Sequence, residues 1–411
     1  MAARNRCSFG LTLVFLAIMS VVILTPGHAW AAYRILLLGD SWSTMMYNSN
    51  AFPRVFADPA FAGAVPANTQ VKGDVTTLVG GTAADWADPA KLAVLGQELA
   101  NNPTIDIVHI SLTGNDFFTT FRAQSDTPEQ RAAKNDAILQ NLRIIMEYVV
   151  AQRPNIRVAV CGYDYVNFNE SVAKPYDSAY VLGFYNAMEQ PTILQLNTAM
   201  VELGQRTIAL CNSIPRCYYV HNFGLMHYVY GYPGLFAALT KPYPGQPPAY
   251  TPFPGGDVNY PSPPVAMNVI TKSGTNYVDP IHLSNNGYFY LAWNCMTSFY
   301  VSWLNNPLPL DTTPPVITLL GSNPATVLQG ATYVDAGATA TDNVDGNITA
   351  QIVKTGTVNT AVIGAYTLTY NVSDAAGNAA VPVTRTVNVV EAPDTTPPVI
   401  TLLGSNPATA L

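Results

Sequence analysis

Two short stretches of the chain carry residue types that could act together as a nucleophile and its base. The apolar run "RILLLGDSWS" (residues 34–43) ends in Gly-Asp-Ser, at the predicted carboxyl end of a strand. Open α/β sheets bind their ligands at that edge, so a serine there would be well placed for chemistry. A serine hydroxyl needs a base to take its proton. In "VDPIHLSNNGY", Asp279 lies three residues before His282 and could orient its imidazole toward the serine.

Each stretch also has a simpler interpretation. Asp-Ser after a strand can be a helix N-cap, and either Ser41 or Ser43 could be the exposed serine. Asp-Pro before His282 can be an ordinary turn with an incidental histidine. The other four histidines are less suitably placed, in the N-terminal apolar segment, inside a predicted strand, or beside a Tyr/Pro-rich segment: His28, His109, His221 and His227.

Two loops could supply hydrogen-bond donors to an oxyanion. In "SLTGNDFF", after a predicted strand, Asn115 offers its side-chain amide and Gly114 allows close approach of the backbone. In "LVGGTAADW", after a predicted strand at about 75–79, a glycine N–H could point to the same place. Either Gly80 or Gly81 could be that donor. Both stretches are also compatible with plain turns.

The pattern around these loops predicts a parallel sheet with helices on both faces. Continuous apolar runs indicate buried strands, and helical patterns lie between them. Residues 222–278 are rich in Pro, Tyr and Gly, and we expect an ordered, packed excursion there. The predicted strands are 33–38, 105–112, 156–161 and 217–221, and the predicted helices are about 127–152, 192–211 and 285–304.

Along the chain the four stretches follow the order Gly-Asp-Ser, glycine loop, Asn-Asp and Asp-x-x-His. In that order they resemble the SGNH (GDSL-type) hydrolase family of esterases and lipases over about residues 33–305. The resemblance implies a flavodoxin-like three-layer α/β/α sandwich and no metal or organic cofactor. It implies Ser41 as nucleophile and His282 as general base and then acid, oriented by Asp279. The oxyanion donors would be Ser41, Gly80 and Asn115. Two residues depart from the family pattern: Thr113 replaces a usual glycine, and Trp42 follows the serine, which would make one wall of the site aromatic.

The function that follows is a secreted serine ester hydrolase acting on acyl or acetyl esters. One alternative is a non-catalytic surface adhesion or binding protein with a hydrolase-like domain. Within enzymes, a thioesterase or a polyester depolymerase is the alternative. The neutral, aromatic segment 222–278 favours an apolar or polymeric substrate.

The C-terminal part has a different pattern. "DTTPPVITLLGSNPAT" occurs at 311–326 and again at 394–409, with alternating strand patterns between the copies. These residues resemble bacterial immunoglobulin-like repeats, which implies an all-β sandwich that serves as a spacer or attachment module. Turn aspartates there could bind Ca²⁺ between repeats, or could simply be solvated: Asp335, Asp342, Asp345 and Asp374. The predicted organisation is a signal peptide (1–31), the hydrolase domain (32–308), an immunoglobulin-like domain (309–393) and an incomplete second repeat (394–411).

Charge, the N-terminal segment and the cysteines indicate which partners and which cellular compartment to expect. A net charge of −7 without a basic stripe argues against nucleic acid. The N-terminus has the positive charge, apolar core and small-x-small cleavage site of a signal peptide, so we expect a secreted or cell-surface bacterial protein. We also expect a monomer. The four cysteines after the signal then predict two disulfides, for which three connectivities exist; we favour Cys211–Cys217 and Cys161–Cys295. A zinc site is the weaker alternative, because no histidine lies near the cysteines in sequence.

Overall fold

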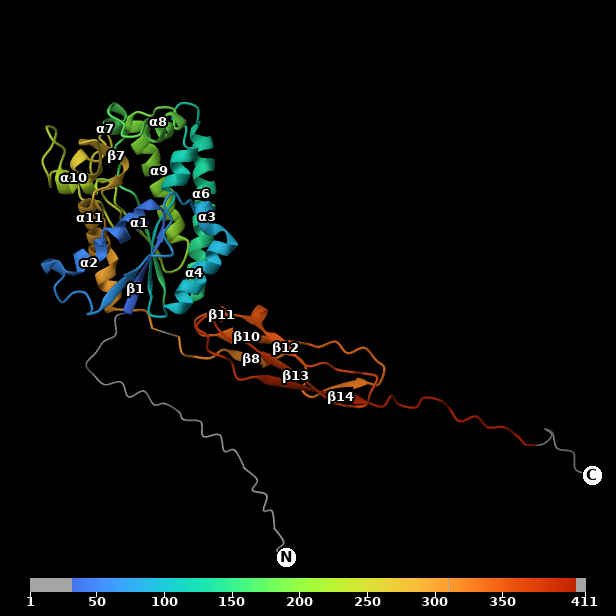
Figure 1. Cartoon of the computed structure of the whole chain (residues 1–411). Coiled ribbons are helices and arrows are strands. Elements are labelled where there is room, and N and C mark those ends of the chain that lie inside the picture. Colours follow the sequence, from blue (N-terminus) through green and yellow to red (C-terminus); the bar gives the residue numbers. More distant parts are fainter. Residues whose placement is uncertain (1–31, 310, 404–411) are drawn as a thin grey trace, which may run out of the picture.

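The computed structural model describes residues 32–309 and 311–403 (Figure 1). The predicted signal peptide, residues 1–31, lies outside the described residues. The first part is built on a five-stranded parallel sheet in the order β2-β1-β3-β4-β5. This flavodoxin-like order confirms the predicted fold class. The strands are β1 (Ala32–Gly39), β2 (Thr69–Lys72), β3 (Ile107–Ser111), β4 (Arg157–Cys161) and β5 (Cys217–Val220).

Burial explains three of these strands and the one strand that was predicted at the wrong place. The strands β1, β3 and β4 lie inside the sheet, and residues 35–38 of β1 are fully buried. Their continuous apolar runs are what strands covered on both faces require. The second strand was expected at about 75–79, but it lies earlier, at the sheet edge in β2. Val75, Leu78 and Val79 are instead exposed in the loop that follows, so the apolar run there marks no strand.

Helices cover the two faces of the sheet. On one side α1 and α2 pack with α11, and on the other α6 packs with α3, α4 and α9 (Figure 1). The helices of this part are α1 (Ser41–Asn48), α2 (Ala51–Phe56), η1 (Pro59–Phe61), α3 (Ala83–Ala87), α4 (Pro89–Asn101), α5 (Gly114–Thr120), α6 (Pro128–Gln152), α7 (Phe168–Ala173), α8 (Ser178–Ala187), α9 (Ile193–Asn212), α10 (Leu225–Tyr230), η2 (Pro264–Ala266), α11 (Asn285–Cys295), the π-helical turn η3 (Met296–Tyr300) and α12 (Val301–Asn305).

The excursion 222–278 is packed against the rest of this part, as predicted. The ring of Phe223 packs on Tyr165, and the ring of Tyr250 packs on Tyr219. The buried Ala266 and Met267 belong to the same core as the sheet. It ends in an antiparallel hairpin of β6 (Met267–Lys272) and β7 (Thr275–Leu283). The register of this hairpin is interrupted: Val269 pairs with Val278, but Met267 pairs with Leu283. Residues 279–282 therefore bulge out of the strand.

The C-terminal part has two small sheets of the kind expected for an immunoglobulin-like sandwich. One has the order β11-β10-β8 and the other β12-β13-β14-β9. Their inner faces share one apolar cluster that includes Ile317, Leu368 and Val387. In the second copy of the repeat, the described residues 394–403 form no strand. The elements are β8 (Val316–Leu319), β9 (Ala325–Leu328), β10 (Ala338–Asp342), β11 (Gly346–Asn347), η4 (Thr349–Gln351), β12 (Val353–Thr355), β13 (Gly364–Asn371) and β14 (Val383–Val390).

Among the residues that the structure describes, no helix is both long enough and apolar enough to span a bilayer.

Candidate active site

Ser41 is the first residue of α1 and lies directly after the carboxyl end of β1. The turn between them requires glycine at position 39, whose φ is +146° and where a Cβ would lie 1.9 Å from the carbonyl oxygen of Ser111. Asp40 caps the helix, because its Oδ1 accepts from the N–H of Trp42 at 2.9 Å. Its own N–H donates to the carbonyl of Ser111 at 3.0 Å. The serine is thus held at the sheet edge by two strands, β1 and β3.

The second carboxylate oxygen of Asp40 accepts a short hydrogen bond from the hydroxyl of Tyr163. The same hydroxyl accepts from the N–H of Gly114 at 3.0 Å. Asp40 is 1% exposed, and burial raises its pKa to about 7 although the bonds from Tyr163 and Trp42 act in the opposite direction. Sequence reasoning missed Tyr163; the available signal was its position just after β4, at the same carboxyl edge of the sheet.

His282 lies beside Ser41. Its Nε2 is 2.8 Å from Ser41 Oγ, and its Nδ1 is 3.0 Å from Asp279 Oδ2. If Nδ1–H donates to Asp279, Nε2 accepts from the serine hydroxyl. All three side chains are buried, with 6%, 7% and 3% of Ser41, His282 and Asp279 exposed. The structure therefore brings together the three residues that the sequence pattern singled out.

The bulge in β7 orients this pair. It lets Asp279 Oδ1 accept from the backbone N–H groups of Ile281 and His282, each at 3.0 Å. Burial alone would raise the pKa of Asp279, but its bonds to His282 and to these N–H groups hold the pKa below its usual value. The carboxylate is consequently ionised at neutral pH, as an acceptor for Nδ1–H must be.

The neighbours of Ser41 face elsewhere. Ser43 is fully buried, and its hydroxyl donates to the carbonyl of Leu38 at 2.9 Å, so it is not directed at His282. Trp42 is 2% exposed and packs edge-on against Tyr163 and Tyr288. The expectation that Trp42 forms an aromatic wall of the site is therefore wrong: the ring lies in the core beneath the serine turn.

The loop of Gly80 and Gly81 runs beside the serine turn. Gly39 makes two hydrogen bonds to the chain just before this loop: its N–H donates to the carbonyl of Thr76, and its carbonyl accepts from the N–H of Leu78. The N–H of Gly81 is already used, because it donates to the carbonyl of Leu78 at 2.9 Å. For the N–H of Gly80, which is exposed with a φ of +76°, no partner occurs among residues 32–309 and 311–403. Of the two glycines, Gly80 is the one with a donor available.

Asn115 reaches across to the same loop. Its Nδ2 donates to the carbonyl of Gly81 at 2.9 Å, which leaves one of its two amide hydrogens for another acceptor. Asp116 makes a second connection, since its Oδ2 accepts from the N–H of Ala83 at 2.9 Å. Thr113, where the family pattern has glycine, adopts a φ of +98°, a region that β-branched residues rarely enter.

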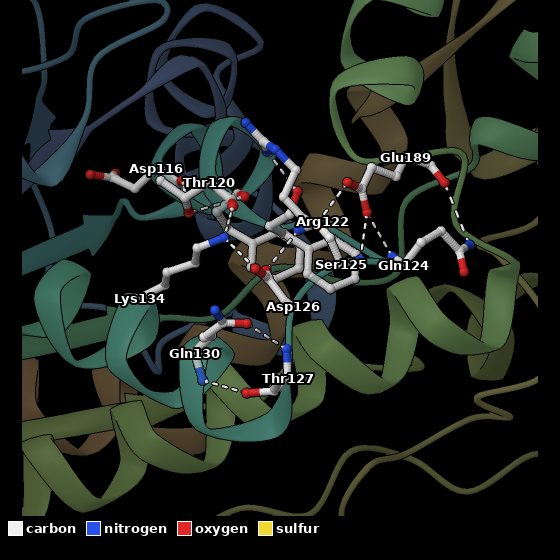
Figure 2. Close-up of polar contacts among 12 residues, drawn as sticks. Asp116, Thr120, Arg122, Gln124, Ser125, Asp126, Thr127, Gln130, Lys134 and Glu189 are labelled. Atoms are coloured by element: carbon white, nitrogen blue, oxygen red, sulfur yellow. Dashed lines mark hydrogen bonds and ion pairs between the residues drawn. The ribbon is translucent and has the colours of Figure 1, made fainter.

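A polar network fixes the far end of α5, the helix that carries Asn115 (Figure 2). Lys134 donates to the carbonyl of Thr120 at 2.8 Å and to Asp126 at 2.5 Å. Glu189 accepts from the backbone of the 124–125 loop. The start of α6 is closed by a capping box between Thr127 and Gln130, the N-terminus predicted from the sequence.

The cysteine prediction differs from the structure. All four described cysteines are free and buried. The sulfurs of Cys161 and Cys295 lie 3.5 Å apart, whereas a disulfide needs about 2.05 Å. Cys211 lies on the buried face of α9, and Cys217 begins β5. The structure also brings His109 to Cys161, with Nδ1 at 3.3 Å from the sulfur, although 52 residues separate them.

The remaining histidines and aspartates have their own partners. His221 and His227 are fully buried away from Ser41, and burial lowers the pKa of His221 to about 3. In the C-terminal part, Asp342 and Asp374 lie together with Asp311, their carboxylate oxygens within 4.8 Å of one another. Asp335 lies apart, in ion pairs with two basic side chains, and Asp345 accepts from a backbone N–H.

Residues 317–389 match the family model described as "Bacterial surface protein, Ig-like domain". Among solved structures, a lipoprotein from Bacteroides thetaiotaomicron is 26% identical over 20% of this chain and 40% of its own, with a TM-score of 0.18. TesA is 16% identical over 64% of this chain and 97% of its own, with a TM-score of 0.33. A carbohydrate esterase family 3 protein from Talaromyces cellulolyticus is 14% identical over 67% and 99%, with a TM-score of 0.32. No curated protein matches.

Proposed function

We propose that the chain is a secreted serine ester hydrolase that works through an acyl-enzyme. The observation that carries the proposal is the buried chain of contacts from Ser41 through His282 to Asp279. A serine, a histidine and an ionised carboxylate in that order can generate and stabilise a nucleophilic alkoxide at neutral pH.

In the first half-reaction, Ser41 Oγ attacks the ester carbonyl carbon while its proton passes to His282 Nε2. The oxyanion of the tetrahedral intermediate would accept from the N–H groups of Ser41 and Gly80 and from the amide of Asn115. Collapse breaks the bond to the alkoxide, which leaves as the alcohol with the proton from His282. An acyl group remains on Ser41 Oγ.

In the second half-reaction, His282 takes a proton from water, whose oxygen attacks the acyl carbon. Collapse of this intermediate returns the proton to Ser41 Oγ and releases the carboxylic acid. Asp279 keeps Nδ1 protonated throughout and stabilises the imidazolium in both halves. No step needs an oxidant, a reductant or a further co-reactant.

The C-terminal segment would place this activity outside the cell or at its surface, as a spacer or attachment module. The match of residues 317–389 to a bacterial surface family supports this location. We propose an acyl or acetyl ester as the substrate. A thioester or a polyester is the alternative, because its hydrolysis would use the same nucleophile.

The test is hydrolysis of p-nitrophenyl acyl esters by Ser41→Ala, with Ser43→Ala as the matched control. Ser41→Ala should lose at least about 10³-fold in kcat and lose labelling by a fluorophosphonate probe, with unchanged circular dichroism. Ser43→Ala removes only the buried bond to Leu38, so it should keep both. Activity in Ser41→Ala would exclude the proposed nucleophile, and an inactive wild-type chain would favour the binding-protein alternative.

A further inference from the structure

Four side chains that the proposed mechanism does not use form a closed cluster under the sheet: His109, Cys161, Cys295 and Tyr300. All are between 0% and 3% exposed. His109 Nδ1 lies 3.3 Å from Cys161 Sγ, 4.0 Å from Cys295 Sγ and 2.9 Å from the Tyr300 hydroxyl. One ring nitrogen thus faces two thiols and a phenol in the interior of the protein.

The fold assembles the cluster from segments far apart in sequence. His109 pairs with Ala159 across β3 and β4, and Cys161, two residues further, projects from the same face of the sheet. Cys295 ends α11, and Tyr300 ends the π-helical turn that follows. In an α-helix, side chains five residues apart point about 140° away from each other. The wider π-turn, whose hydrogen bonds join residues five apart, returns Tyr300 to the side of Cys295.

The spacing of the ligand atoms suits one metal ion. A triangle with sides of 3.3, 3.5 and 4.0 Å, the distances among His109 Nδ1, Cys161 Sγ and Cys295 Sγ, has a circumscribed circle of radius about 2.1 Å. An ion slightly out of that plane would lie at the roughly 2.0–2.3 Å of Zn–N and Zn–S bonds. The Tyr300 hydroxyl is next to this triangle, 4.0 Å from Cys161 Sγ.

The other nitrogen of His109 is oriented as in many metal sites. Nε2 is 3.1 Å from the hydroxyl of Ser111, so Nε2–H can donate there and leave Nδ1 free of its proton. Ser111 also accepts from the N–H of Asp40 through its carbonyl. The cluster is therefore directly connected to the turn that holds Ser41.

We propose that His109, Cys161 and Cys295 bind a zinc ion, with the hydroxyl of Tyr300 as the fourth ligand. Two thiols lose their protons on binding, and the two thiolates balance the charge of Zn²⁺ in this buried place. Because no position is left for water or substrate, the ion would be structural, stabilising the packing of α11 and η3 on the sheet. The proposal does not depend on the esterase function.

Elemental analysis of the purified full-length chain tests it. We expect about one zinc per chain in the wild type, loss of that zinc in Cys161→Ser and in Cys295→Ser, and its retention in Cys217→Ser, a buried cysteine outside the cluster. Replacement by Co²⁺ should give the thiolate charge-transfer band and the strong visible bands of a tetrahedral cobalt site, and both should be weaker in His109→Gln.

Native mass spectrometry of the wild type keeps the test independent of whether the variants fold. A mass increase of one zinc, released by acid, supports the proposal. A metal-free chain two hydrogens lighter than the fully reduced form, with Cys161 linked to Cys295 in its peptide map, would overturn it. A metal-free chain whose Cys161 and Cys295 are reactive thiols after unfolding would overturn it as well.

Discussion

The hydroxyl of Tyr163 donates to the carboxylate of Asp40, the residue immediately before the candidate nucleophile. Because it also accepts from Gly114, it joins the ends of β1, β3 and β4 at one atom. This connection positions the serine turn relative to the Asn115 loop. Sequence reasoning missed this interaction, although Tyr163 follows β4 at the same carboxyl edge of the sheet.

Tyr163→Phe should therefore weaken both stability and catalysis. It leaves a buried carboxylate and the N–H of Gly114 with one partner fewer, which costs about 1–3 kcal/mol in unfolding free energy. A small displacement of Ser41 should lower kcat by roughly 10²-fold with little change in KM. Urea unfolding and ester kinetics measure the two effects.

Tyr165→Phe is the control for that variant. Its hydroxyl is also buried and donates to the carbonyl of Gly255 at 3.2 Å, away from Ser41. It should lose stability without losing kcat. Equal losses of kcat in both variants would show that Tyr163 has no special positioning role.

Asp40 should make stability depend on pH. Its carboxyl has a pKa of about 7 in the folded chain against an ordinary value of 3.8, so the folded state holds more protons than the unfolded state between these values. The contribution of Asp40 to the unfolding free energy should then be largest below about pH 4 and be lost as the pH rises through 7. In Asp40→Asn this decline should be shallower, though Asp164, whose pKa burial also raises to about 7, keeps part of it. Parallel curves from urea unfolding across that range would contradict the assignment.

Gly39→Ala should prevent correct folding of the site. A Cβ at this position would lie 1.9 Å from the carbonyl oxygen of Ser111, and the φ of +146° is unfavourable for alanine. Gly183→Ala is the matched control, because it lies in α8 with nothing within 4 Å of its Cβ and should gain about 0.5–1 kcal/mol. Thermal unfolding followed by circular dichroism distinguishes them. A Gly39→Ala chain as stable as wild type would mean that the turn differs from the one described.

Thr113→Gly should stabilise the chain. A β-branched residue at φ +98° is strained, and glycine adopts this conformation freely, so we expect a gain of about 1 kcal/mol despite the greater flexibility of unfolded glycine. The midpoint of urea unfolding measures the change. A decrease of that midpoint would mean that the buried threonine side chain contributes more by packing than its backbone costs.

Much of the candidate site could be predicted from the sequence because it lies where strands end. Apolar runs mark the buried strands, and the carboxyl ends of parallel strands share one edge. Ser41 and Asn115 were therefore expected to lie close together, and the Asp-x-x-His spacing was enough to pair Asp279 with His282. Read alone, Gly-Asp-Ser-Trp-Ser could not distinguish Ser41 from Ser43, and Gly-Gly could not distinguish Gly80 from Gly81; the order and spacing of all four stretches favoured Ser41 and Gly80. Those choices depend on which hydroxyl and which N–H already have a partner in the folded chain.

Other features were decided only by the tertiary structure. The second strand was misplaced because an edge strand needs only a short, partly buried run, while an exposed loop can be just as apolar. His109 was set aside because it lies inside a predicted strand, and a zinc site was the weaker alternative because no histidine lies near the cysteines in sequence. The register of β3 and β4 and a π-turn nevertheless bring two thiols to the ring of His109. Tyr163 meets Asp40 for the same reason. Sequence spacing predicts which side chains are neighbours along one strand or helix. Contacts across a sheet depend on strand order and register, which only the packed fold determines.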